Sequence, residues 1–310
     1  MSDAHVPVLF EEALDALDIR ADGCYLDATF GRGGHSAGIL ERLGPQGRLL
    51  AIDRDPEAVA AGRERFAGDV RFAICQTSFA RLDDCPADRL AGCDRFDGVL
   101  MDLGVSSPQL DQPQRGFSFR MEGPLDMRMD TTRGETAGQW LQQVSEKALA
   151  KVLKTYGEER YSKRVAAAIV RAARAGELES TTRLAEVIRA AIPGRGGDKD
   201  KATRSFQAIR IAVNREMEEL ENGLPGLVER LNQGGRLVVI TFHSLEDRLV
   251  KQTFRRWSSG PQLPRKLPVP ESAQRAPFRV VGKPLKASAA EVAANPRARS
   301  ATLRVLERVA

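Results

Sequence analysis

A glycine-rich loop and an aspartate 22 residues after its first glycine are the residues of this chain best suited to bind a cofactor. The loop Gly31-Arg32-Gly33-Gly34 follows a short apolar segment, and Asp53 closes the next one. Glycines there let the backbone approach a ligand, and a carboxylate at the end of the following strand can accept both ribose hydroxyls. The pair predicts a cofactor that contains adenosine, either a dinucleotide or S-adenosylmethionine. The alternative is a plain tight turn and a surface aspartate.

Three features favour S-adenosylmethionine over a dinucleotide. The third glycine position of the dinucleotide motif is Ser36 in this chain. Asp27, four residues before the loop, is common in methyltransferases and is not needed to bind a pyrophosphate. The last two strands, expected over 278–281 and 302–306 and joined without a helix, suit a methyltransferase sheet whose last strand is antiparallel.

Apolar segments separated by amphipathic ones position these residues. Strands are expected over 24–30, 48–52, 70–75, 96–102 and 236–241, and they are apolar enough for a parallel sheet covered on both faces. Asp55 is expected to cap the helix that begins at Pro56. Helical spacing dominates the intervening region, with helices expected over 136–149, 145–156, 160–175, 181–192 and 203–222. The sequence thus predicts an α/β domain (1–112 and 214–310) with an all-helical domain (113–213) inserted after the fourth strand.

Composition excludes several classes of protein. The chain has 310 residues, of which 42% are hydrophobic and 29% charged, as in ordinary globular proteins. It contains no apolar run long enough to span a membrane, and residues 1–5 show no secretory signal. The four cysteines form no Cys-x-x-Cys pair, so reduced thiols in a cytoplasmic protein are expected. No metal site is expected, because none of the three histidines lies at zinc-ligand spacing from a cysteine.

Charge is unevenly distributed along the chain. Residues 113–213 carry a net charge of +7 and residues 251–310 a net charge of +10, so the remainder carries −12. Such a division favours a polyanionic partner, with solvated helix faces and a basic tail as the alternative.

Eight stretches closely resemble the bacterial MraW/RsmH family, which methylates N4 of one cytidine in small-subunit (16S) ribosomal RNA. They are DATFGRGGH (27–35), LAIDRDP (50–56), DLGVSSPQL (102–110), RGFSF (115–119), GPLDMRMD (123–130), LKTYGEER (153–160), FHSLEDR (242–248) and NPRARS (295–300). The resemblance implies a Rossmann-like class I methyltransferase sheet with an inserted helical domain, and S-adenosyl-L-methionine as the cofactor.

The resemblance also implies which residues bind the cofactor. Asp53 is expected to hold the ribose, and Phe79 to pack on adenine, with a plain core position as the alternative for the phenylalanine. Asp102 ends the fourth strand near the methionine part, where its carboxylate could pair with the amino group. The full expected set is Gly33, Gly34, His35, Asp53, Phe79, Asp102 and Gln109.

The cytosine N4 lone pair is delocalised into the ring, so a hydrogen-bond acceptor on the N4 hydrogens would assist methyl transfer. Many amino-methyltransferases carry an Asp/Asn-Pro-Pro-aromatic motif after the fourth strand, but here the aromatic residue is missing, and Phe117 or Phe119 could replace it. Asp102 and Ser106 are candidate acceptors. His243, after the fifth strand, is a candidate for a catalytic or substrate-binding role, with a structural role as its alternative. Ser244 is expected to cap the next helix with Asp247.

The inserted helices concentrate basic residues, and the resemblance implies that they recognise RNA. The residues are Lys151, Lys154, Arg160, Lys163, Arg164, Arg171 and Arg174. Such residues contact phosphates without specifying a base. The expected partner is small-subunit ribosomal RNA, in an assembled or nearly assembled subunit; homodimerisation stays open. Two other functions stay open as well, an amino-methyltransferase acting on DNA or free nucleotides, and a non-catalytic ribosome assembly factor.

Overall fold

The structure, a computed structural model, describes residues 7–86, 92–194, 200–260 and 276–310. Residues 1–5, used above for the export prediction, lie outside this part. The chain divides into two compact units, one of Met1–Gly104 with Glu218–Ala310 and the other of Val105–Met217. The second unit begins eight residues before the expected insertion and ends four residues after it. Among the described residues, no helix is long and apolar enough to cross a membrane.

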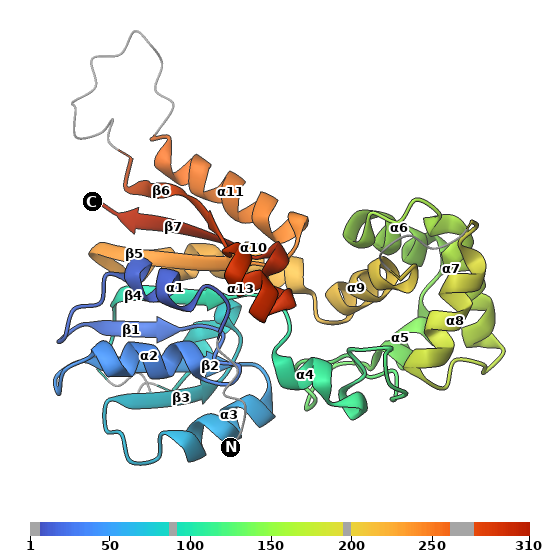
Figure 1. Cartoon of the computed structure of the whole chain (residues 1–310), viewed down its shortest axis with the longest axis horizontal. Coiled ribbons are helices and arrows are strands. Elements are labelled where there is room, and N and C mark those ends of the chain that lie inside the picture. The colour runs from blue at the N-terminus through green and yellow to red at the C-terminus, as the bar shows by residue number, and fades with distance from the viewer. Residues whose placement is uncertain (1–6, 87–91, 195–199, 261–275) are drawn as a thin grey trace, which may run out of the picture. The chain divides into compact units, whose positions relative to one another are not determined.

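The first unit is built on a seven-stranded sheet in the order β3-β2-β1-β4-β5-β7-β6, which Figure 1 shows from β6 at the top to β3 at the bottom. The strands are β1 (Cys24–Asp27), β2 (Arg48–Asp53), β3 (Phe72–Gln76), β4 (Phe96–Asp102), β5 (Leu231–Thr241), β6 (Phe278–Lys286) and β7 (Thr302–Arg308). The first five strands are parallel, and β7 inserts antiparallel between β5 and β6. This strand order and the antiparallel β7 confirm the predicted Rossmann-like class I methyltransferase fold.

Helices cover both faces of this sheet. On one face, Tyr25, Leu49 and Leu100 pack with α1 (Phe10–Leu17) and α2 (Gly34–Arg42), and α3 (Pro56–Arg65) packs beside them. On the other face, Leu26 and Val99 pack with α10 (Glu216–Glu229) and α11 (Ser244–Ser258). The side chains of successive strand residues therefore point to opposite faces of the sheet, as in any pleated strand. Because both faces are buried, the strand sequences are continuously apolar.

The second unit consists of helices around their own core. Its elements are α4 (Ser107–Asp111), η3 (Pro113–Arg115), α5 (Ala137–Gln143), α6 (Glu146–Gly157), α7 (Ser162–Arg174), α8 (Thr181–Ala191) and α9 (Ala202–Val213). Helix α6 packs against both α7 and α9, and α7 packs against α8. Leu149, Leu153 and Ile169 are fully buried in this core.

Three predictions about elements are wrong. The helix expected over 136–149 ends with α5 at Gln143, and α6 begins at Glu146. The single helix expected over 203–222 is two helices, α9 and α10, because Arg215 adopts a left-handed conformation between them (φ 50°). The Asn214 side chain stabilises this break by bonding the backbone of Met127, Met129 and Arg210. The last two strands are not joined without a helix, since α13 (Ala289–Ala294) and η4 (Pro296–Ser300) lie between them. By contrast, Asp55 caps α3 as predicted, accepting from the Glu57 amide at 3.0 Å.

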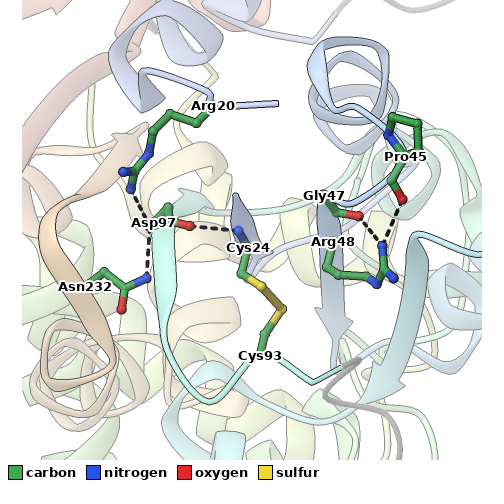
Figure 2. The surroundings of a disulfide bond; sticks show 8 residues. All are labelled: Arg20, Cys24, Pro45, Gly47, Arg48, Cys93, Asp97 and Asn232. Atoms are coloured by element: carbon green, nitrogen blue, oxygen red, sulfur yellow. Dashed lines mark hydrogen bonds and ion pairs between the residues drawn. A yellow bond between two sulfur atoms is a disulfide. The ribbon is translucent and has the colours of Figure 1, made fainter. Parts of the chain in front are cut away.

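The expectation of four reduced thiols is also wrong. Cys24, at the start of β1, forms a disulfide with Cys93, in the loop before β4, with the two Cα atoms 6.0 Å apart (Figure 2). The pairing escapes sequence reasoning because 69 residues separate the two cysteines and only the adjacency of β1 and β4 brings them together. Asp97 accepts from the Cys24 amide and from Asn232, and it pairs with Arg20. Cys75 and Cys85 keep their thiols and are buried.

Candidate functional site

Three aspartates close three adjacent parallel strands. Asp27 ends β1, Asp53 ends β2 and Asp102 ends β4, and β1 lies between the other two strands. The carboxyl ends of parallel strands share one edge of a sheet, which is where open α/β sheets bind their ligands. The structure therefore brings together three carboxylates that are far apart in the sequence.

The glycine loop lies at the same edge and leads into α2. Gly33 is the residue that precedes α2 and has φ +69°, a conformation that side chains disfavour. A Cβ on Gly33 would lie 2.4 Å from the ring of Phe30, so the loop has no room for one. A Cβ on Gly34 would likewise lie 2.3 Å from Pro7. The backbone path thus requires glycine at position 33, and the contact with Pro7 requires glycine at position 34. Amides in the first turn of a helix such as α2 can bind a ligand.

Asp53 connects this loop to the second strand. Its Oδ2 accepts from the Gly31 amide and its Oδ1 from the Asp55 amide, each at 2.8 Å. Burial and, to a smaller extent, the charge of Asp55 raise the pKa of Asp53 to about 6, against the lowering effect of the two amides. A carboxylate has about four acceptor positions. Asp53 can therefore hold the loop and still accept two ribose hydroxyls.

Asp27 is fully enclosed beside the loop. The Ser36 hydroxyl donates to its Oδ2 at 2.6 Å, and the Thr29 amide donates to its Oδ1 at 3.2 Å. Burial and, to a smaller extent, the charge of Asp53 raise the pKa of Asp27 to about 6, against the lowering effect of these two hydrogen bonds. Within the described residues, no lysine or arginine forms an ion pair with Asp27. A cation bound here would find uncompensated negative charge.

Asp102 and His35 lie close together, and each has one side-chain atom without a hydrogen-bond partner among the described residues. His35 Nδ1 lies 3.7 Å from Asp102 Oδ2, and the Asp102 amide donates to the Thr29 hydroxyl at 2.6 Å. Burial lowers the pKa of His35 to about 4, so its imidazole is neutral near pH 7 and the contact is not an ion pair. Burial, and then the charges of Asp27 and Glu246, raise the pKa of Asp102 well above its usual value. His35 Nε2 and Asp102 Oδ1 are buried without a hydrogen-bond partner among the described residues, which suits a site that waits for a ligand.

His243 caps a helix in this structure. It precedes α11, and its Nδ1 accepts from the Glu246 amide at 3.3 Å. Glu246 in turn accepts from the amides of Phe242 and His243. His243 Nε2 lies 3.0 Å from Glu246 Oε1 but forms no hydrogen bond there. The predicted cap of Ser244 with Asp247 is therefore wrong by one residue, and Asp247 instead pairs with Arg304 through both oxygens.

The remaining predicted site residues, Phe79, Ser106 and Gln109, make other contacts. Phe79 begins the short helix η1 (Phe79–Asp84) and packs half-buried on Gly223 of α10. Ser106 and Gln109 belong to the second unit, where the Gln109 side chain accepts from the Ser106 amide at 3.0 Å and caps α4. Their roles toward a cofactor or a substrate stay predictions.

Two residues near Asp27 and Asp102, Thr29 and Glu246, were not predicted from the sequence. Thr29 bonds both Asp27 and Asp102, and Glu246 lies close enough to Asp102 to raise its pKa. Thr29 stands in the same nine-residue stretch as Asp27, so its position in the strand-to-loop turn was a usable signal. Glu246 stands in the stretch 242–248, close to the predicted His243, but only the packing of β4 beside β5 shows that it lies near Asp102.

Comparison with known proteins places this chain in a family. The sequence model of the MraW methylase family matches residues 2–309 of this chain. The chain belongs to the MraW methylase family. The "Ribosomal RNA small subunit methyltransferase H" of Thioalkalivibrio sulfidiphilus is 56% identical over 308 residues, which cover 99% of this chain and 98% of that protein. The protein of the same name from Thiobacillus denitrificans is 55% identical over 311 residues, covering 100% of this chain and 99% of that protein.

Among solved structures, a putative rRNA methylase from Clostridium thermocellum covers 99% of this chain and 98% of its own, at 11% identity and a TM-score of 0.45. The strand order, rather than this likeness, identifies the fold. Membership of the MraW methylase family agrees with the expected cofactor, S-adenosyl-L-methionine. The residues at the sheet edge also fit that molecule, because its sulfonium and ammonium groups are cationic and its ribose carries two hydroxyls. The three aspartates and the unpartnered oxygen of Asp102 match that chemistry.

Proposed function

We propose that this protein is an S-adenosylmethionine-dependent methyltransferase that modifies the exocyclic N4 amino group of a cytidine in small-subunit (16S) ribosomal RNA. The observation that carries the proposal is the set of three carboxylates on one sheet edge, with Asp102 Oδ1 unpartnered beside the neutral His35. The full-length relatives named ribosomal RNA small subunit methyltransferases support the RNA substrate. Such a substrate would place the protein in the cytoplasm.

The cofactor would supply an electrophilic methyl group on a sulfonium. Asp53 would accept the ribose hydroxyls, and the loop Gly33–His35 would offer backbone amides at close approach. Asp27 and Asp102 would provide negative charge for the cationic groups. Phe79 and Gln109 would complete the binding site as the family resemblance implies.

Asp102 is the chain's best candidate for accepting an N4 hydrogen. A carboxylate whose pKa is raised holds a proton more readily than an ordinary one, so it is a stronger base when ionised. His243 fits this task less well, because its Nδ1 already accepts from the helix it caps. Ser106 lacks a comparable basic group. The alternative role for Asp102 is to pair with the amino group of the methionine part. Asp102→Asn separates the two roles, since loss of turnover with unchanged cofactor affinity supports the acceptor and weakened affinity supports the ion pair.

The helical unit would bind the RNA. Seven of its cations, all exposed, lie on or between α6 and α7: Lys151, Lys154, Arg160, Lys163, Arg164, Arg171 and Arg174. Exposed lysines and arginines of this kind suit contacts with phosphates, which position a protein on its RNA but do not specify a base. A second basic region, residues 251–310, belongs to the other unit. An RNA that engages both regions would make more phosphate contacts than a short oligonucleotide bound to one of them.

Mass spectrometry of ribosomal RNA from a strain that lacks this gene tests the reaction. N4-methylcytidine should fall in the small-subunit RNA and return with the wild-type gene, but not with the Asp102→Asn variant. An unchanged level of N4-methylcytidine would refute the proposal and favour a methyltransferase for DNA or free nucleotides. Restoration by a variant that cannot bind the cofactor would instead favour a non-catalytic assembly factor.

A transfer assay tests the form of the substrate. Purified small subunits, protein-free ribosomal RNA and a short oligonucleotide of the same target sequence are compared at equal concentration. We expect the subunits to react fastest, because folded RNA presents phosphates to both basic regions and supplies a base that is already positioned. Equal rates on all three would show that the local sequence suffices, while leaving the reaction itself intact.

A further inference from the structure

The segment Pro7–Phe10 packs on the first turns of α2. Pro7 lies against Gly34, where a Cβ would come within 2.3 Å of it. The rings of Phe10 and His35 stack, with centroids 5.9 Å apart and planes inclined by 29°. The backbone of Val8 lies close enough to His35 to affect the pKa of the imidazole. Three residues of this segment thus contact the glycine loop and the histidine that follows it.

The segment holds an unfavourable backbone conformation at its centre. Leu9 is a fully buried leucine with φ +52°, in the left-handed region. In that region an L side chain crowds the following carbonyl oxygen, and such residues persist only where the surroundings enforce them. The Leu9 carbonyl accepts from Ala13 at 2.8 Å and so starts α1. The conformation of Leu9 therefore sets the direction in which Phe10 leaves the turn.

One side chain from the other end of the sequence enforces this turn. The Leu9 amide donates to Glu291 Oε1 at 2.7 Å across a separation of 282 residues. Glu291 stands on α13, where its own amide donates to the Ser288 hydroxyl at 3.1 Å. The next residue, Val292, packs on the same apolar cluster as Leu9. Glu291 is consequently held on both sides, by its helix cap and by the core beneath α13.

We propose that Glu291 is a positioning residue for cofactor binding. By holding Leu9 in its left-handed conformation, it keeps Pro7 on Gly34 and Phe10 on His35, and so fixes the loop that receives the cofactor. The inference rests on the proposed function, since that function assigns Gly33, Gly34 and His35 to the cofactor. It adds a residue that does not itself belong to the sheet edge, and it makes the C-terminal helix α13 part of the cofactor site.

Calorimetric titration of S-adenosylhomocysteine, the demethylated product, tests the proposal without requiring turnover. Glu291→Ala should weaken binding about five- to tenfold, because it removes a charge-assisted acceptor from a buried amide. Glu291→Gln keeps an acceptor oxygen and should restore most of the affinity. Glu41→Ala, which removes an exposed carboxylate from α2 itself, is the matched control and should bind as the wild type does. In turnover, Glu291→Ala should raise KM for the cofactor by a similar factor and leave kcat nearly unchanged.

Hydrogen exchange of the ligand-free protein provides a second readout. The Leu9 amide should exchange faster in Glu291→Ala than in the wild type or Glu291→Gln, and Phe10→Leu, which loses the ring stack, should weaken cofactor binding with Leu9 still protected. Wild-type affinity in a folded Glu291→Ala would overturn the inference, as would an equal loss in Glu291→Gln and Glu291→Ala. If the wild-type protein itself fails to bind the cofactor product, the proposed function fails instead, and the two failures are thereby distinguished.

Discussion

The Ser36 hydroxyl donates a 2.6 Å hydrogen bond to Asp27, and both residues are buried. Ser36 occupies the position of the third glycine of a dinucleotide-binding loop, where a glycine allows close packing of helix on strand. Here the serine uses that closeness to satisfy a carboxylate at the end of β1. The serine at this position argues against a dinucleotide, and it also stabilises the negative charge of Asp27, which suits a cationic cofactor.

Removing this hydroxyl should be costly. Ser36→Ala leaves Asp27 Oδ2 without its donor, and an unsatisfied buried acceptor costs about 1–3 kcal/mol. We expect the free energy of unfolding, measured by chemical denaturation, to fall by that amount. In an Asp27→Asn background the same change should cost clearly less, because the charge that needs the hydroxyl is absent. An equal loss in both backgrounds would show that Ser36 acts by packing alone.

The raised pKa values of Asp27 and Asp53 predict opposite pH dependences for stability and for cofactor binding. Both values are about 6, above the usual 3.8 of an aspartate. The protonated forms therefore stabilise the ligand-free fold, an effect fully present below about pH 4 and lost as the pH rises through 6. Ionised carboxylates bind a cationic cofactor and accept its ribose hydroxyls best, so the contribution of Asp27 and Asp53 to affinity should rise between pH 5 and 7 and then level off.

Calorimetry at pH 5, 6 and 7 measures this dependence, and buffers of different ionisation enthalpy reveal the protons released on binding. Asp27→Asn should flatten the affinity profile and should also flatten the fall in stability of the ligand-free protein from pH 4 to pH 7. Cofactor affinity that is constant from pH 5 to 7 would contradict the assignment of these aspartates to the site.

Asp53 should contribute to cofactor affinity in two ways, by contacting the ribose and by holding the glycine loop through the Gly31 amide. Asp53→Ala removes the two expected ribose contacts, worth roughly 1.5–3 kcal/mol each before water compensates, and it also frees the Gly31 amide. Cofactor affinity should fall at least tenfold in titration calorimetry. Asp53→Asn keeps one acceptor oxygen and should lose less. A folded Asp53→Ala that binds the cofactor normally would remove this residue from the ribose site.

The sequence predicts the sheet edge better than it predicts the contacts made there. Periodicity and glycine placement predict β1, β2 and β4 and the three aspartates that end them, because parallel strands align their carboxyl ends. The break at Arg215 is not predictable in this way. It depends on Asn214 reaching the backbone of Met127 and Met129, which are 87 and 85 residues away. The contact of Glu291 with Leu9 likewise joins the two ends of the chain.

The disulfide predicts a specific thiol count. Cys24 and Cys93 form a disulfide, whereas Cys75 and Cys85 keep their thiols. The protein denatured without reductant should therefore show about two titratable thiols by a thiol reagent, out of the four cysteines in the chain. After reduction all should react. A Cys75→Ser, Cys85→Ser variant should show none before reduction. Four thiols in the unreduced wild type would mean that the pair is not oxidised under those conditions.

The basic helices should govern RNA affinity and leave cofactor affinity alone. Lys151, Lys154, Lys163 and Arg164 are exposed on α6 and α7, and each lost phosphate contact lowers the salt slope of binding by about 0.7–0.9. Replacing all four by glutamine should weaken small-subunit binding and reduce that slope by up to about 3. The charge-preserving variant, with arginine at the three lysines and lysine at Arg164, should retain both affinity and slope. Cofactor titration should be the same in all forms, since the neutralised residues belong to the helical unit and the three aspartates to the other. If the glutamine variant binds RNA with the wild-type slope, these helices present only a solvated face, and RNA recognition must come from other residues.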